Sequence, residues 1–192
     1  MKRLIVVFIV ALAMVATASA QDVFEKGNIT MGGSASFTMS SGDLYENADG
    51  DGSSSFGFYP SAGYFVMDNL SVGLGIGFDS YSRGDYSSGG MSFGPHVHYY
   101  LAQMGPGNPF GHLGYTMGSR KWDPGTANSV ETKESFSTLS LGAGYIYFLN
   151  DKVGVTGALI YEMDSETQKE PTELDSESGT QLIFRFGFRM FL

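Results

Sequence analysis

The last fourteen residues, 179–192, alternate between apolar and polar positions and still contain two arginines. One face of this segment is formed by Leu182, Phe184, Phe186, Phe188, Met190 and Leu192. The other face carries Gln181, Arg185, Gly187 and Arg189. A soluble β-sandwich would bury the aromatic face, but such a chain rarely ends on its most apolar strand. A membrane barrel explains both faces, because lipid contacts the aromatic residues while the arginines point into a polar lumen.

Residues 1–20 are typical of a cleaved export signal. Lys2 and Arg3 form a positive start, 4–16 form an apolar run too short for a membrane-spanning helix, and 18–20 form a small-residue cleavage site. We therefore expect residues 21–192 to be the mature chain and a single domain. The sequence has no cysteine, which excludes disulfides, a lipid-modified amino-terminal cysteine and thiolate chemistry.

The composition excludes one class of partner and favours one fold class. The formal net charge is -9, and removal of Lys2 and Arg3 takes away two positive charges and leaves -11. Nucleic acid is therefore not an expected partner. The 27 glycines, the 14% aromatic content and the absence of helical periodicity indicate an all-β chain.

Eight segments have the two-residue period of a β-strand, and the connections between them alternate in length. The segments are 27–40, 53–66, 70–81, 91–102, 109–119, 135–149, 152–163 and 179–192. Short turns near 68–69, 105–107 and 150–151 alternate with polar loops at 41–52, 82–90, 120–134 and 164–178. This pattern predicts an eight-stranded antiparallel transmembrane up-and-down β-barrel, with turns in the periplasm and loops at the cell surface. A periplasmic barrel or sandwich is the alternative.

The strand number, the Val-Gly-Leu-Gly sequence at 72–75 and the Phe-rich final segment resemble a known family. Residues 21–192 resemble the small outer-membrane β-barrel proteins, the porin-like superfamily that includes OmpX-like proteins and the membrane domain of OmpA. The resemblance implies an integral location in the bacterial outer membrane, contact with its lipids and lipopolysaccharide, and insertion by the barrel-assembly machinery. Members usually end in an aromatic residue, a place that Leu192 holds here.

The lumen of an eight-stranded barrel is just wide enough to be filled by side chains, so we expect a packed polar interior. Arg185 and Arg189 need anions there, and Glu162 on the neighbouring segment has the parity to supply one. Asp79 and Tyr59 are expected to add polar lining. We interpret these residues as a structural network, and a narrow ion-conducting pore is the alternative.

Three histidines are predicted to lie in the same lumen. If the turn is centred near 105–106, His98 lies opposite His112, with His96 two residues away on the same face. Such a cluster can bind a transition metal or act as a base. No spaced carboxylates accompany it, and the histidines and the nearby Ser92 lack the His-x-Ser arrangement of lipid deacylases. We therefore expect no metal, no cofactor and no enzymatic activity.

One motif in the first loop resembles half of a calcium site. Asn47, Asp49 and Asp51, followed by Gly52, match the alternating oxygen ligands of a calcium loop. Phe58 stands where the last carboxylate ligand would be needed.

Two further loops suggest surface roles. Arg83, Gly84 and Asp85 form a tripeptide known from integrin ligands, which makes adhesion a hypothesis. The predicted loop 164–178 has six acidic residues against Lys169, a net charge of -5. It is typical of a solvated loop, and a divalent-cation bridge to lipopolysaccharide is its functional alternative.

Together these features predict a non-enzymatic integral outer-membrane barrel with a filled polar lumen. Its expected role is that of an envelope scaffold that displays surface loops, whose ligand is unknown. A narrow porin, a lipid-modifying enzyme and an adhesin are the alternative functions.

Overall fold

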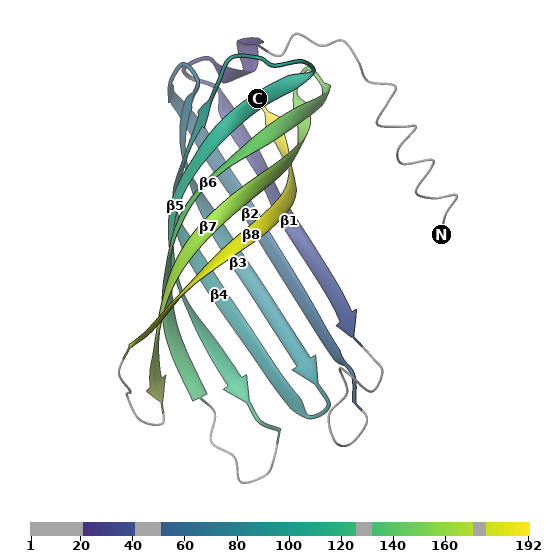
Figure 1. The fold of residues 1–192 in the computed structure, drawn as a ribbon, viewed down its shortest axis with the longest axis vertical. Coiled ribbons are helices and arrows are strands. Elements are labelled where there is room, and N and C mark those ends of the chain that lie inside the picture. Colours follow the sequence, from purple (N-terminus) through teal and green to yellow (C-terminus); the bar gives the residue numbers. More distant parts are fainter. Residues whose placement is uncertain (1–20, 41–50, 126–131, 171–175) are drawn as a thin grey trace, which may run out of the picture.

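The computed structural model describes residues 21–40, 51–125, 132–170 and 176–192. Its eight strands form a closed antiparallel barrel in sequence order, preceded by the short 3-10 helix η1 (Gln21–Phe24) (Figure 1). The strands are β1 (Ile29–Ser40), β2 (Ser53–Met67), β3 (Leu70–Arg83), β4 (Tyr86–Tyr100), β5 (Gly107–Asp123), β6 (Thr132–Asn150), β7 (Val153–Glu170) and β8 (Glu177–Phe191). The predicted up-and-down β-barrel is confirmed.

No helix in the described part of the chain is long and apolar enough to cross a membrane.

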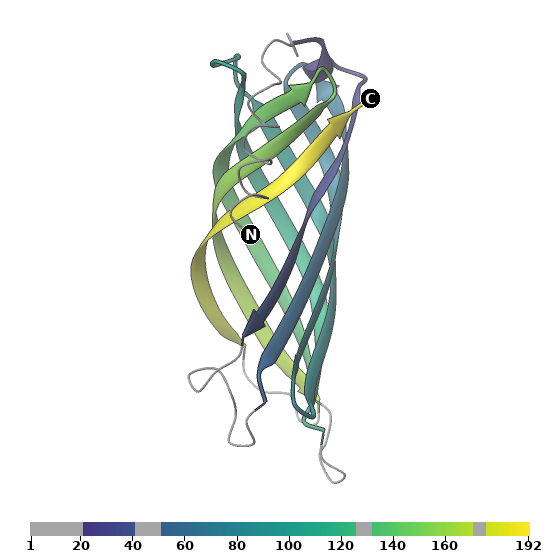
Figure 2. The same ribbon diagram turned by 90° about the vertical axis from the view of Figure 1, so that its right-hand side faces the viewer.

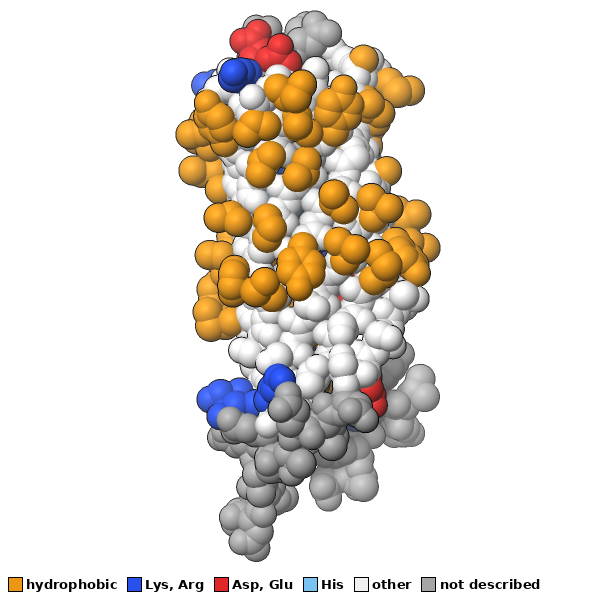
Figure 3. Space-filling view, turned by 90° about the vertical axis from the view of Figure 1, so that its left-hand side faces the viewer, with side chains coloured by type: hydrophobic (Ala, Val, Ile, Leu, Met, Phe, Trp, Pro, Cys, Tyr) orange, Lys and Arg blue, Asp and Glu red, His pale blue; other side chains and the backbone are white. Residues whose placement is uncertain are grey.

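The outer surface carries the apolar half of each alternating strand. On β8, for example, Phe184 and Phe186 are exposed, while Arg185 between them lines the lumen. Figure 3 shows the apolar side chains gathered in a broad band toward the turn end of the barrel, with charged side chains beyond it at both ends. This band has the position that a bilayer core requires, because only apolar side chains are stable against lipid tails.

The strands continue beyond the predicted segments at the loop end. The predicted loop 82–90 is wrong: β3 ends at Arg83 and β4 begins at Tyr86, with only Gly84 (φ 56) and Asp85 between them. Likewise β7 reaches Glu170 and β8 begins at Glu177, so most of the predicted loop 164–178 is strand. Outside the lipid both faces of a strand meet water, so these extensions are polar on both faces and their sequence looks like loop. Short and long connections therefore do not alternate strictly.

An aromatic plug closes the turn end of the barrel. The plug consists of the buried side chains of Phe24, Phe65, Tyr100, Phe148 and Phe191. Phe24 of η1 lies at its centre, stacked on Tyr100 at 4.4 Å and edge-on to Phe191 at 5.4 Å between ring centroids. The prediction of a polar interior is therefore wrong for this end, where inward positions hold large apolar residues.

Backbone contacts hold η1 over the mouth of the barrel. The Asn69 N–H donates to the Phe24 carbonyl at 2.8 Å, and the Gly27 N–H donates to the Phe65 carbonyl at 2.9 Å. The Lys26 N–H donates to the Asp68 carboxylate at 2.9 Å. The β2–β3 turn thus fixes the segment that carries Phe24.

The barrel closes where β8 meets β1, and this boundary is short. Among the described residues the two strands pair only from Thr30 opposite Phe191 to Gly33 opposite Phe188. Ile29 and Leu192 exchange two backbone hydrogen bonds, of 2.9 and 2.8 Å, at the turn end. Beyond Gly33 the purple β1 and the yellow β8 run apart toward the loop end (Figures 1 and 2).

Candidate functional site

A cavity of about 400 Å³ lies in the lumen on the loop side of the aromatic plug. All eight predicted network residues line it: Tyr59, Asp79, His96, His98, His112, Glu162, Arg185 and Arg189. The interior is therefore not packed throughout, contrary to the sequence-based prediction. The barrel is filled only where large aromatic side chains occupy inward positions, and glycine and serine positions elsewhere leave space. The volume lies within the range of small-molecule sites.

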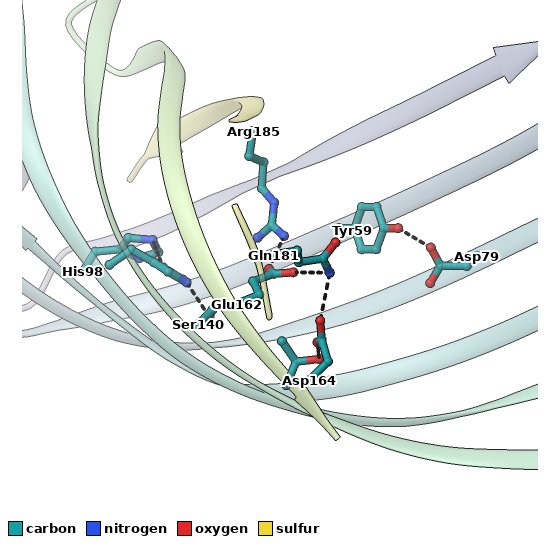
Figure 4. Close-up of polar contacts among 10 residues, drawn as sticks. Tyr59, Asp79, His98, Ser140, Glu162, Asp164, Gln181 and Arg185 are labelled. Atoms are coloured by element: carbon teal, nitrogen blue, oxygen red, sulfur yellow. Dashed lines mark hydrogen bonds and ion pairs between the residues drawn. The ribbon is translucent and has the colours of Figure 1, made fainter. Parts of the chain in front are cut away.

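An ion pair stands near the middle of the cavity. An Arg185 guanidinium nitrogen lies 2.7 Å from Glu162 Oε1, and Glu162 is buried (Figure 4). Gln181 donates to Glu162 at 3.3 Å and to Asp164 at 3.0 Å, and Thr138 donates to Asp164 at 2.6 Å. Neighbouring strands β6, β7 and β8 thus supply one connected network, in which each carboxylate receives more than one donor.

Arg189 has a different environment from Arg185. Its guanidinium reaches His98 Nε2 at 3.5 Å, and no carboxylate of the described residues forms an ion pair with it. Glu162, the predicted partner of both arginines, pairs with Arg185 alone. Among the described residues, Arg189 at the plug end of the cavity thus has no ion-pair partner.

The structure brings the three histidines together on β4 and β5. His98 pairs with His112 across the two strands, and the two ring nitrogens, His98 Nε2 and His112 Nδ1, lie 3.0 Å apart. His112 Nε2 lies 3.1 Å from the hydroxyl of Ser140 on β6. His96 is also buried, at a ring-centroid distance of 4.9 Å from His98, and its Nε2 atom has no hydrogen bond.

The chain Ser140–His112–His98 has the spacing of a nucleophile, a base and an orienting group. The sequence pointed to Ser92 rather than Ser140, because the pairing of β5 with β6 could not be read locally. In a hydrolytic triad the third group is usually a carboxylate that stabilises the imidazolium. Here that group is a second imidazole beside Arg189, so no carboxylate is in place to stabilise an imidazolium. The electrostatics therefore favour a hydrogen-bonded lining.

The described residues contain no group of three or more histidine, aspartate or glutamate side chains arranged to hold a metal ion. Of the half calcium motif, Asn47 and Asp49 lie outside the described residues, and Asp51 precedes β2.

The loop end of the cavity holds the predicted residues Tyr59 and Asp79, and Tyr59 donates a hydrogen bond to Asp79. It also holds Arg120, which was not predicted from the sequence. Arg120 lies over the rings of Trp122 and Phe136, at 5.4 and 5.3 Å from the centroids. The parity of β5 continues from His112 through Arg120, and this signal could have placed Arg120 in the lumen had 120–134 not been read as a loop.

The hairpin between β3 and β4, at the loop end of the barrel, carries the tripeptide Arg83, Gly84 and Asp85. Gly84 and Asp85 are exposed in the turn between β3 and β4. The Nε atom of Arg83 is buried without a hydrogen bond, and the chain at Gly125 approaches Asp85 closely. The tripeptide is thus partly covered by its own barrel.

Comparison with known proteins agrees with this architecture. The model of the family described as "outer membrane protein beta-barrel domain" matches residues 8–190. The chain belongs to this family. The match shows an integral outer-membrane barrel and supports an outer-membrane location.

Several solved structures share the fold of this outer-membrane barrel. The N-terminal β-barrel domain of Pseudomonas aeruginosa OprF is 13% identical, with a TM-score of 0.53, and the match covers 87% of this chain and 98% of that one. Neisserial surface protein A is 15% identical, with a TM-score of 0.51 and coverage of 86% and 97%. OprG from Pseudomonas aeruginosa is 15% identical, with a TM-score of 0.51 and coverage of 88% and 97%.

No curated protein matches the sequence closely. At these identities the structural likeness shows the fold alone.

Proposed function

We propose that this outer-membrane barrel is a non-conducting, non-enzymatic scaffold that stabilises the envelope and presents its extended hairpins at the cell surface. The observation that supports this proposal is the aromatic plug. Phe24, Phe65, Tyr100 and Phe191 are each no more than 2% exposed, so their rings leave little room for water between them. Contact with lipopolysaccharide, insertion by the barrel-assembly machinery and cleavage after residue 20 are part of the same proposal.

The physical case against conduction is the dryness of the plug. Ions cross a pore only where water or polar groups replace their hydration shell, and burial of a bare ion among aromatic rings costs many kcal/mol. The plug also has little freedom to move, because backbone hydrogen bonds attach η1 to the β2–β3 turn. The cavity is therefore proposed to be a blind chamber.

The test is single-channel recording of residues 21–192 refolded into planar bilayers. The heat-modifiable gel shift of a closed barrel first establishes that the sample is folded. We expect no discrete conductance steps, because the plug excludes a continuous water column. Regular steps from folded wild-type protein would contradict the proposal and would favour the narrow-pore alternative, lined by Arg185, Arg189 and Glu162.

A matched pair of variants tests whether the aromatic plug is what blocks conduction. Phe24→Ala removes the central ring of the plug, whereas Phe37→Ala removes a ring from the lipid-facing side of β1, where Phe37 is 67% exposed. We expect any new conductance to arise in Phe24→Ala and none in Phe37→Ala.

A further inference from the structure

The β1–β8 boundary leaves two strand edges without partners inside the apolar band. We call residues 34–40 of β1 and 177–187 of β8 the seam. Within the described chain, β1 pairs here only with β2, and β8 only with β7. Phe37 and Met39 on one edge and Phe184 and Phe186 on the other are exposed and apolar, so this part of the seam lies at the depth of the bilayer core.

The lumenal cavity extends to this seam. Its lining includes Gly33 and Ser34 of β1 and Phe186, Gly187 and Phe188 of β8. Phe186 and Phe188 belong to the outer, lipid-facing half of β8. The cavity therefore reaches the backbone at the point where β1 and β8 stop pairing.

Glycines lie at the crossing where the seam begins. A Cβ atom on Gly32 would lie 2.4 Å from the Phe188 carbonyl oxygen, and one on Gly187 would lie 2.7 Å from the Gly33 carbonyl oxygen. Only glycine allows the two backbones to approach so closely. The strands thus cross tightly here and separate beyond Gly33.

Unpaired backbone at this depth restricts what can occupy the seam. Bare amide and carbonyl groups facing hydrocarbon cost several kcal/mol each, so such edges are tolerated only beside a polar or water-filled space. The cavity is such a space, and an occupant with a polar end can satisfy groups that lipid tails cannot.

The whole lining holds four carboxylates, Asp79, Glu162, Asp164 and Glu166, against three arginines, so the place that favours an anionic polar end is the part beside Arg185 and Arg189. Arg185 stands beside the seam: continuing the β1–β8 register would place it opposite Ser36. Its side chain is 44% exposed, and its ion pair with Glu162 uses one of its guanidinium nitrogens. A guanidinium has five N–H donors, so donors are left for an anion. Arg189, without a carboxylate partner among the described residues, adds further positive potential.

We propose that the seam is a lateral entrance through which the lumen binds a single-chain amphiphile with an anionic head group from the outer leaflet. The head group accepts hydrogen bonds from Arg185, and the alkyl chain lies in the seam between Phe37 and Phe186. This binding is independent of the plug, because the two lie at different heights of the barrel.

The test uses residues 21–192 in phosphatidylcholine vesicles with doxyl-labelled stearate at alkaline pH, where its carboxyl group is ionised. Electron paramagnetic resonance measures the immobilised probe, and the doxyl-stearate methyl ester serves as a neutral probe of the same shape. We expect saturable immobilisation of stearate beyond the boundary lipid seen with the ester. Arg185→Gln is expected to weaken it about tenfold, as for loss of a charge-assisted hydrogen bond.

A second set of variants tests the route of entry. The chain lacks cysteine, so Thr38→Cys with Ile183→Cys introduces one bridge across the seam. Where oxidation leaves these thiols free, a bis-maleimide that spans the gap makes the same lock. The control is Thr38→Cys with Ser55→Cys, which links β1 to its true neighbour β2.

We expect the locked seam to lose the saturable component, with recovery after reduction of the disulfide, and the β1–β2 link to keep it. Equal immobilisation of stearate and its ester would overturn the proposal, since it would show boundary lipid alone. Undiminished binding with the seam locked would overturn it as well. Neither result requires any variant of Arg185 to fold.

Discussion

At the scale of single residues, Arg185 and Arg189 show how position within a barrel decides the environment of a charge. Both are inward residues of β8, four positions apart. Arg185 lies beside Glu162 on β7, while Arg189 lies at the level of Gly154, which has no side chain to pair with. Arg189 instead contacts His98 from the opposite wall. A partly buried charge with no ion-pair partner among the described residues is costly, which is why this end of the cavity favours an anion.

Removal of the central carboxylate should destabilise the barrel. Glu162→Gln leaves Arg185 without its ion-pair partner, and we expect a loss of about 1–3 kcal/mol in the free energy of unfolding. Urea unfolding in vesicles, followed by the fluorescence of Trp122, the only tryptophan, measures the change.

Two comparisons give this measurement its meaning. Glu162→Gln combined with Arg185→Gln removes both charges and should recover part of the loss. Glu166→Gln, which removes a half-exposed partner 3.6 Å from Arg120, should cost less than about 1 kcal/mol. Equal effects at Glu162 and Glu166 would contradict the role given to the buried pair.

At the scale of elements, the four-residue helix η1 has an effect out of proportion to its length. It places Phe24 against four aromatic rings that come from β2, β4, β6 and β8. Strands on all sides of the barrel thus contact one side chain, which stabilises the closed shape at the turn end. The polar extensions at the other end are held by their backbone ladders and by a smaller set of aromatic contacts, in which Tyr86 meets Tyr81 and Trp122.

Phe24→Ala should therefore lower stability more than any lipid-facing aromatic substitution. We expect a loss of about 3–5 kcal/mol from the cavity that the variant leaves in the plug. The midpoint temperature of the heat-modifiable gel shift reports the change, with Phe37→Ala as the comparison. An unchanged midpoint for Phe24→Ala would show that η1 does not seat in the barrel mouth.

At the scale of the whole molecule, the barrel wall is uneven. Strands β5, β6 and β7 pair with their neighbours along nearly their full lengths, whereas β1 and β8 pair with each other only near the turn end. Opening should therefore begin at the seam, since it has the fewest backbone hydrogen bonds to break.

Amide hydrogen exchange can detect this unevenness. In residues 34–40 only the amides that face β2 have ladder partners, so we expect every second amide to exchange rapidly in vesicles. Residues 139–147 of β6, paired on both sides, should be protected throughout. Continuous protection of the amides along 34–40, measured by NMR, would mean that β1 and β8 are hydrogen-bonded along the seam in the bilayer, which would contradict this prediction.

The sequence by itself determined the barrel, its strand number and which residues face inward, including the pairing of His98 with His112. These properties follow from the two-residue period and from short turns, which are local. It did not determine where β3 and β7 end or where β8 begins at the loop end of the barrel, because polar strands outside the membrane have the composition of loops.

Only the tertiary structure decided the plug, the pairing of Glu162 with Arg185 rather than Arg189, the Ser140 contact and the open seam. Each of these depends on strand register, tilt and curvature, which bring together residues far apart in the chain. Phe24 carries no local sign of its burial, because its partners come from strands on opposite walls. The two-residue period of a strand shows which side chains point inward, but it does not show which inward side chains from different strands will touch.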